Sequence, residues 1–191
     1  MAPPDLLHAS PARTGTGRAS HVELITRQWQ QERGELELEN FLLSIYFMRL
    51  GTLVERAYDR MCREACGVSG GDMRVLLALR RGGPPYLKRP TDLFRALLVT
   101  SGAITKKIDR LSGAGYVERQ PDPGHQGGCL IRLTKRGLLV VDDAVERLAN
   151  DSVLAAAMQQ FSPEERRSGS AFALRILNAL EEARDGTDPD H

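Results

Sequence analysis

The sequence predicts a mainly α-helical protein that carries a short helix-turn-helix followed by a two-stranded β-ribbon. Apolar residues recur every three or four positions through most of the chain, which is the period of a helix with one buried face. In residues 129–134 the period changes to two, which is typical of a strand. The loop before this strand, residues 121–128, is rich in glycine and proline and indicates a hairpin.

The two ends of the chain are expected to lack regular structure. Residues 1–20 are rich in proline, glycine, serine and alanine and have no periodicity, so they predict a disordered arm. Residues 185–191 are expected to form a loose C-terminal tail without regular structure. We expect the residues between them, 21–184, to form one domain, which begins with a short helix over residues 21–33.

Two stretches of helical period are longer than a small lobe can bury. Residues 35–66 contain no proline and predict one helix about 45 Å long, at ~1.5 Å per residue. Thr134 is expected to cap a second long helix that ends near Gln160. Ser162 and the Pro-Glu-Glu that follows it combine a capping box with a proline in the first turn, which predicts a last helix. Residues 35–66 and 135–184 therefore predict dimerisation helices of an obligate homodimer.

Shorter elements lie between these helices, in residues 69–134. Ser69-Gly-Gly-Asp72 predicts a turn and cap before a short apolar helix. Pro90 suits the first turn of another helix, which we expect to run from Thr91 to Leu98. Thr100 is expected to cap the next helix. The order of helix, four-residue turn, helix and ribbon is that of a winged helix-turn-helix, a fold that reads DNA.

The charge distribution supports a DNA-reading lobe. Residues 80–136 contain twelve lysines and arginines against four acids, a net charge of +8, whereas the rest of the chain carries −7. A basic segment between acidic flanks is the electrostatic pattern of a DNA-binding lobe. The alternative is that these charges only keep an ordinary surface solvated.

The second helix of the helix-turn-helix has one apolar and one polar face. Ile104, Ile108 and Leu111 predict the buried side. We expect Thr105 and Lys106 to reach base edges, Thr100 and Ser101 to lie at phosphates, and Arg95 and Arg132 to contact the DNA backbone.

Other function classes find little support. No apolar run is long enough for a membrane span, and no secretory signal is visible, so a cytoplasmic protein is expected. The three cysteines form no disulfide framework, and Cys62 and Cys66 are interpreted as structural thiols rather than oxidant sensors. No zinc spacing, catalytic triad, phosphate loop or dinucleotide motif occurs, which argues against an enzyme, a metal site and a cofactor.

Several motifs resemble the multiple-antibiotic-resistance regulator (MarR) family. They are Thr100-Ser-Gly-Ala-Ile-Thr-Lys-Lys-Ile-Asp-Arg-Leu111, Gly115-Tyr-Val-Glu-Arg119, Pro121-Asp-Pro123 and Leu133-Thr-Lys-Arg-Gly137. The resemblance covers about residues 35–180 and implies a homodimer that binds double-stranded DNA. It also implies a pocket between the dimerisation helices and the DNA lobe, where small molecules, often aromatic acids, loosen DNA binding.

The wing departs from the family pattern. Family wings usually read Asp-Pro-x-Asp-Arg-Arg, and the arginine enters the minor groove. Here Asp122-Pro-Gly is followed by His125 and Gln126, so the second acid and both arginines are absent. His125 and Gln126 can substitute only weakly, or the wing contacts phosphate alone.

A narrower resemblance is to the urate-responsive subgroup, which has an extra N-terminal helix with a tryptophan. Trp29 matches that tryptophan, and Arg74, Lys107 and Arg119 match the subgroup's pocket residues, with arginine in place of an aspartate and lysine in place of an arginine. These changes favour a more acidic ligand than urate. Independently, Lys107 lies on the apolar edge of its helix, where an unpaired charge is costly. It either reaches solvent along its stem or holds an anion near Arg74.

The sequence therefore predicts a transcription regulator, a repressor that a small anionic aromatic ligand releases from DNA. The alternative is a helical protein-interaction module with a winged lobe that no longer binds DNA, for which the missing wing arginines are the main argument.

Overall fold

The computed structural model describes residues 20–125 and 127–185. The chain divides by its internal contacts into two compact units, residues 1–51 and 52–191, and helix α2 (Glu39–Cys66) belongs to both. Most of the arm and the tail predicted from sequence lie outside the described residues. Ser20 is an exception, because it caps the first helix.

The first unit contains α1 (His21–Glu32) and the start of α2. Ser20 and Glu23 form a capping box at the start of α1. The two helices meet through Trp29 and Phe41, whose rings lie edge to face with centroids 5.0 Å apart. The prediction of a helix from residue 35 was wrong by four residues. Around Gly34 the backbone turns, with the Leu36 amide donating to the Arg33 carbonyl, so α2 cannot begin before the turn ends.

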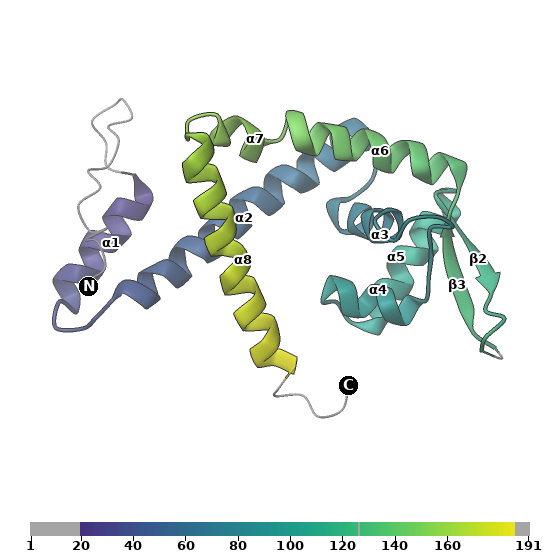
Figure 1. The fold of residues 1–191 in the computed structure, drawn as a ribbon, viewed down its shortest axis with the longest axis horizontal. Coiled ribbons are helices and arrows are strands. Elements are labelled where there is room, and N and C mark those ends of the chain that lie inside the picture. Colours follow the sequence, from purple (N-terminus) through teal and green to yellow (C-terminus); the bar gives the residue numbers. More distant parts are fainter. Residues whose placement is uncertain (1–19, 126, 186–191) are drawn as a thin grey trace. The chain divides into compact units, whose positions relative to one another are not determined.

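In the second unit, three short helices form the predicted helix-turn-helix region (Figure 1). They are α3 (Gly70–Arg80), α4 (Pro90–Leu97) and α5 (Ser101–Gly113). Leu98 follows the last residue of α4 in a left-handed conformation, with φ 53°. Only Val99 separates it from Thr100. The Thr100 hydroxyl accepts a hydrogen bond from the Ala103 amide and so caps α5, as predicted.

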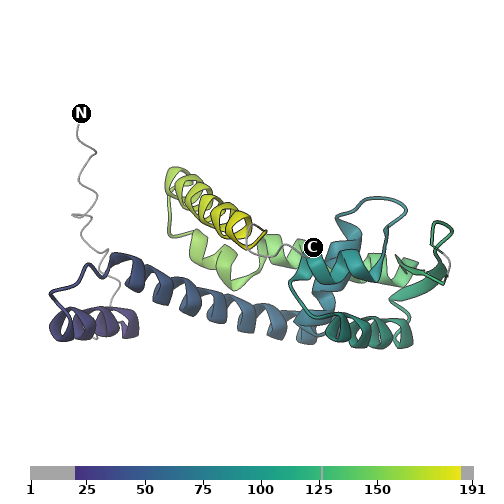
Figure 2. The ribbon, with the colours of Figure 1, turned by 90° about the horizontal axis from the view of Figure 1, so that it is seen from below.

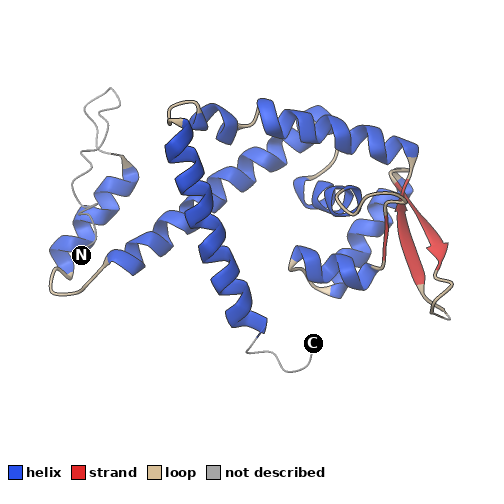
Figure 3. Cartoon of the chain, in the orientation of Figure 1, coloured by secondary structure: helices blue, strands red, loops and turns tan. Residues whose placement is uncertain are grey.

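The sheet has three strands rather than the two predicted. β2 (Val117–Pro121) and β3 (Cys129–Leu133) form the expected antiparallel hairpin, and β1 (Leu87–Lys88) pairs with the other edge of β3. Figures 2 and 3 show the hairpin beside the helices of the lobe, with its tip projecting from it. Two residues are too few to show a strand period, which is why the sequence did not reveal β1.

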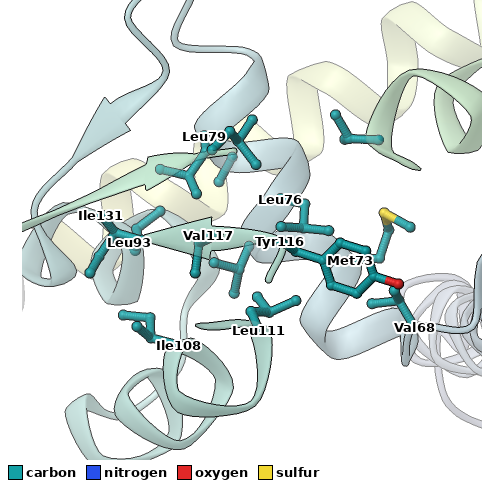
Figure 4. Close-up of a cluster of buried hydrophobic side chains, with 14 of the residues drawn as sticks. Val68, Met73, Leu76, Leu79, Leu93, Ile108, Leu111, Tyr116, Val117 and Ile131 are labelled. Atoms are coloured by element: carbon teal, nitrogen blue, oxygen red, sulfur yellow. The ribbon is translucent and has the colours of Figure 1, made fainter. Parts of the chain in front are cut away.

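The core of the second unit joins the sheet to the helices of the lobe (Figure 4). Leu76 and Leu79 of α3, Ile108 of α5 and Ile131 of β3 are almost completely buried. Each such side chain contributes about 1.5–3 kcal/mol by its transfer out of water. The core therefore fixes one face of α5 against α3 and the hairpin.

The C-terminal helices differ from the prediction at one point. α6 (Lys135–Asn150) begins at the predicted Thr134 cap but does not continue to residue 160. Instead Ser152 accepts a hydrogen bond from the Ala155 amide and starts a separate helix, α7 (Val153–Met158). α8 (Pro163–Asp185) begins at the predicted capping box of Ser162 and Glu165.

None of the helices within the described ranges is both long and apolar enough to cross a membrane.

Gly137 should be essential for the junction between α6 and the hairpin. A Cβ atom at this position would lie 2.1 Å from the Tyr116 carbonyl oxygen, so alanine should force the two apart and lower the free energy of unfolding by about 1–3 kcal/mol. Gly102→Ala is the matched control, because no atom lies within 4 Å and alanine suits a helix better by ~1 kcal/mol. Thermal unfolding of both variants measures the difference, and equal melting temperatures would contradict it.

Candidate nucleic-acid interface and ligand recess

Helix α5 presents two chemically different faces, as the sequence predicted. Ile104, Ile108 and Leu111 are 1–2% exposed and hold the helix on the lobe. The outer face is polar and exposed; it consists of Ser101, Gly102, Thr105, Lys106 and Asp109. The Thr105 hydroxyl donates to the Ser101 carbonyl, so its oxygen is left to accept from a partner outside the chain. A helix arranged in this way can enter a DNA groove without losing its packing.

The two neighbouring lysines of α5 have different environments. Lys106 is exposed, and no acidic oxygen of the described ranges lies within 4 Å of its amino group. Lys107 is only 18% exposed, and its Nζ lies 3.9 Å from an oxygen of Asp72. Lys106 is therefore available to an external anion such as a phosphate, whereas Lys107 already faces a carboxylate.

Asp72 connects the start of α3 to α5. Its two carboxylate oxygens accept hydrogen bonds from Nη2 and Nε of Arg110, at 2.7 and 3.0 Å. Burial by itself would raise the pKa of the Asp72 carboxyl, but the hydrogen bonds from Arg110 and Ser69, with the nearby charge of Lys107, hold it below its usual value. Asp72 is thus ionised at neutral pH although it is buried.

A second carboxylate anchors the loop of the wing. The Asp122 side chain is 6% exposed; it accepts from Arg89 Nε at 2.7 Å and from the Gly124 amide at 2.9 Å. The hydrogen bond from Arg89 lowers the pKa of this carboxyl. Because Arg89 immediately precedes α4, the contact ties the wing loop to the helix-turn-helix. His125 is exposed on this loop, and Gln126 lies outside the described residues.

The other predicted DNA contacts lie at the surface of the lobe. Arg95 is exposed on α4, with its guanidinium 6.0 Å from the Phe94 ring centroid. Arg132 is exposed on β3 and lies 3.8 Å from Glu118, a distance at which the pairing is loose. The predictions that Arg95 and Arg132 contact phosphates stay predictions.

A recess of about 300 Å³ opens between α2 and α3. Residues of both helices line it: Glu55, Arg56, Tyr58, Asp59, Gly70 and Gly71. Lys107 reaches its edge, because its Nζ lies 2.5 Å from where a Cβ of residue 71 would be, and a side chain at this glycine would displace it. The recess thus combines an aromatic ring with charges of both signs.

The predicted ligand residues do not form a cluster of unpaired cations. Arg74 forms an ion pair with Glu55, with Nη2 3.1 Å from Oε1, and its guanidinium lies over the Tyr58 ring, 5.6 Å from the ring centroid. Arg119 donates to Asp109 at 2.6 Å. Lys107 is not the isolated charge that the sequence indicated, because an oxygen of Asp72 lies 3.9 Å from its amino group. Trp29 packs on Phe41 in the first unit, so its role in ligand binding stays a prediction.

Asp72 is a residue of the site that was not predicted from the sequence. Asp72 was interpreted only as part of a turn, although it precedes Met73, Val75 and Leu76, all of them apolar. An acidic residue directly before an apolar run indicates a carboxylate close to the core, and a buried carboxylate is costly unless a cation pairs with it. This pattern could have predicted a cationic partner for Asp72. The identity of that partner, Arg110, could not be read from the sequence, because it lies 38 positions away.

The environments of Cys62 and Cys66 are those of structural thiols. Cys62 is fully buried in the core, and burial raises the pKa of its thiol to about 11. Burial also raises the pKa of Cys66, which lies near Asp143. Both are therefore protonated and weakly nucleophilic at neutral pH. Cys129 of β3 is partly buried against the core.

Comparisons with known proteins agree with this geometry. Residues 67–126 match the family model described as "MarR family". The chain is 30% identical over 163 residues to the HTH-type transcriptional regulator PecS of Dickeya dadantii. The aligned region covers 85% of this chain and 96% of PecS. It is 29% identical over 106 residues to the multiple antibiotic resistance protein MarR of Escherichia coli, covering 54% of this chain and 72% of that protein.

Solved structures show the same fold. A mutant MarR of Escherichia coli, crystallised with operator DNA, superposes with a TM-score of 0.59 at 25% identity, covering 72% of this chain and 97% of that chain. A MarR family regulator of Streptomyces coelicolor, solved in complex with DNA, gives a TM-score of 0.61 at 24% identity and covers 76% and 93% of the two chains. On these matches, which for PecS span nearly the whole of both chains, this protein belongs to the MarR family of winged helix-turn-helix transcription regulators.

Proposed function

We propose that this chain acts as a homodimeric repressor that reads DNA with α5 and leaves it when a small ligand binds. One observation carries the DNA-binding part: α5 buries its apolar face and exposes Thr105 and Lys106, with no acid of the described residues paired to Lys106. The solved MarR relative crystallised with operator DNA supports the same use of the lobe.

Dimerisation is supported by apolar surface that the second unit leaves exposed. On α8, four large apolar side chains are 51–64% exposed: Phe172, Leu174, Leu177 and Leu180. Scattered apolar residues are common on protein surfaces, but several on one helix mark an interaction site. We propose that α8 of a second copy covers them, as the sequence predicted for residues 135–184.

The ligand proposed is a small anionic aromatic compound in the recess between α2 and α3. The Tyr58 ring, with Arg74 over it, offers a surface for a ligand ring, and Lys107 at the edge offers a cation. Glu55 and Asp59 also line the recess, so an anion there must compete with them for their cations. Because Lys107 belongs to α5, a ligand that draws its amino group away from Asp72 would also disturb the DNA-reading helix.

Lys106→Ala should weaken binding to the DNA that precedes the protein's own coding sequence. If Lys106 contacts a phosphate, affinity should fall on all sequences and the salt slope should flatten by about one unit. If it contacts a base, the loss should be about 1–3 kcal/mol and confined to the specific site. Gel shifts at two salt concentrations, with an unrelated duplex as competitor, separate the two cases.

Arg167→Ala is the matched control, because it removes an exposed cation from α8 rather than α5. It should leave affinity and salt slope unchanged. A Lys106→Ala protein that binds like wild type would show that α5 is not the reading helix. A wild-type protein that binds no DNA would favour the alternative, a winged lobe used for protein interaction.

Leu174→Lys combined with Leu177→Lys should convert the dimer to a monomer. The two leucines are more than half exposed in the single chain, so lysines there should not destabilise the folded monomer. They should oppose dimerisation, because a second copy packed on them would bury their charges. Sedimentation at micromolar concentration measures the change. Arg175→Glu, between the two leucines but on another side of the helix, should remain dimeric. A wild-type protein that sediments as a stable monomer would refute the proposal.

Lys107→Met should make DNA binding insensitive to aromatic acids. Benzoate should release the wild-type protein from DNA, whereas benzyl alcohol, an uncharged analogue, should release it much less. The variant should bind DNA nearly as well as wild type, because Arg110 still partners Asp72, but benzoate should no longer release it. Equal release of variant and wild type would show that Lys107 does not hold the ligand.

A further inference from the structure

Asp72 is a charged residue fixed by backbone structure at the start of α3. It lies in the first turn, its amide donates to the Ser69 hydroxyl at 3.1 Å, and the residue is 6% exposed. The backbone at this point is held by the cap and by the buried neighbours Met73 and Val75. The carboxylate therefore has little freedom to move, and a partner that binds it is held to α3.

Arg110 of α5 binds this carboxylate directly, and Lys107, three positions earlier on the same side of the helix, lies near it. Arg110 uses both Nε and Nη2, in the fork geometry that matches a carboxylate. Lys107 lies one turn earlier, 3.9 Å from the same oxygen that Nη2 contacts. Arg110 is half exposed, so the contact lies at the margin of the core, where α5 meets the outside.

Apolar packing decides which face of α5 is buried, but it sets the rotation about the helix axis less closely than a directional contact does. Hydrophobic contacts are non-directional. A two-point hydrogen bond to a guanidinium is directional, because both N–H groups must point at the two oxygens. The Asp72–Arg110 contact thus adds an orientation that packing alone does not define.

We propose that Asp72 is a positioning residue for DNA reading, which through Arg110 sets the exact rotation of α5 and so the angle at which the exposed Thr105 and Lys106 are presented. This rests on the proposed function of α5. Asp72 itself touches no DNA in this arrangement. Arg110 uses one edge of its guanidinium on Asp72, and the proposal assigns it the role of holding α5 in place; the salt slope of the Arg110 variant tests whether its remaining N–H donors contact phosphate.

The test compares Asp72→Asn, Arg110→Gln and the double variant in gel shifts at three salt concentrations, with thermal unfolding measured in parallel. Each single variant should bind DNA about tenfold more weakly, and the double variant no more weakly than either, because all three lack the same contact. The salt slope should stay as in wild type, because no phosphate contact is lost.

Arg80→Gln is the matched control. It breaks an arginine–carboxylate contact that joins α3 to Asp142 of α6 instead of to α5. It should leave DNA affinity unchanged.

Three results would overturn the proposal. If Arg110→Gln flattens the salt slope by about one unit while Asp72→Asn does not weaken binding, Arg110 is a phosphate contact. If both variants melt at a lower temperature but bind DNA like wild type well below that temperature, the contact serves stability only. If the losses of the single variants add in the double variant, the two residues act separately. Should Asp72→Asn fail to fold, Arg110→Gln, changed at a half-exposed position, still decides: a flattened salt slope, or wild-type DNA binding with a lowered melting temperature, overturns the proposal. Failure of the wild-type protein to bind DNA would instead refute the proposed function.

Discussion

The burial of one face of α5 organises the packing of the whole lobe. Ile104, Ile108 and Leu111 must leave water, and α3 and the hairpin provide the surface that covers them. Once that face is fixed, the helical period of 3.6 residues places Thr105 and Lys106 on the other side. Packing and presentation to DNA are therefore two consequences of one amphipathic sequence.

The cations of the lobe fall into two groups, according to whether a carboxylate of the chain lies beside them. Arg110, Arg89 and Lys107 lie against carboxylates, and the first two tie α5 to α3 and the wing loop to α4. Lys106 and Arg95 have no such acid among the described residues and remain for an external anion. The net charge of the basic segment is thus a poor measure of its DNA-binding capacity, because part of it neutralises buried acids within the lobe.

Local signals in the sequence were sufficient for most elements. Thr100, Thr134 and Ser162 cap the helices that they were expected to cap, because a capping hydroxyl acts within three residues of its partner. The errors lie where a local pattern was weak or was overridden. The period of α6 runs on toward α7, but Ser152 starts a new helix, and β1 is too short to show any period.

The family, most of the elements and the buried and exposed faces of α5 could be predicted from the sequence alone, because these follow from motifs and periodicity along the chain. How the charges pair depends on the tertiary structure. Lys107 and Arg110 meet Asp72 across 35 and 38 positions of sequence, and Arg89 meets Asp122 across 33. Such contacts depend on how α3, α5 and the wing pack together, so neither residue spacing nor composition contains them.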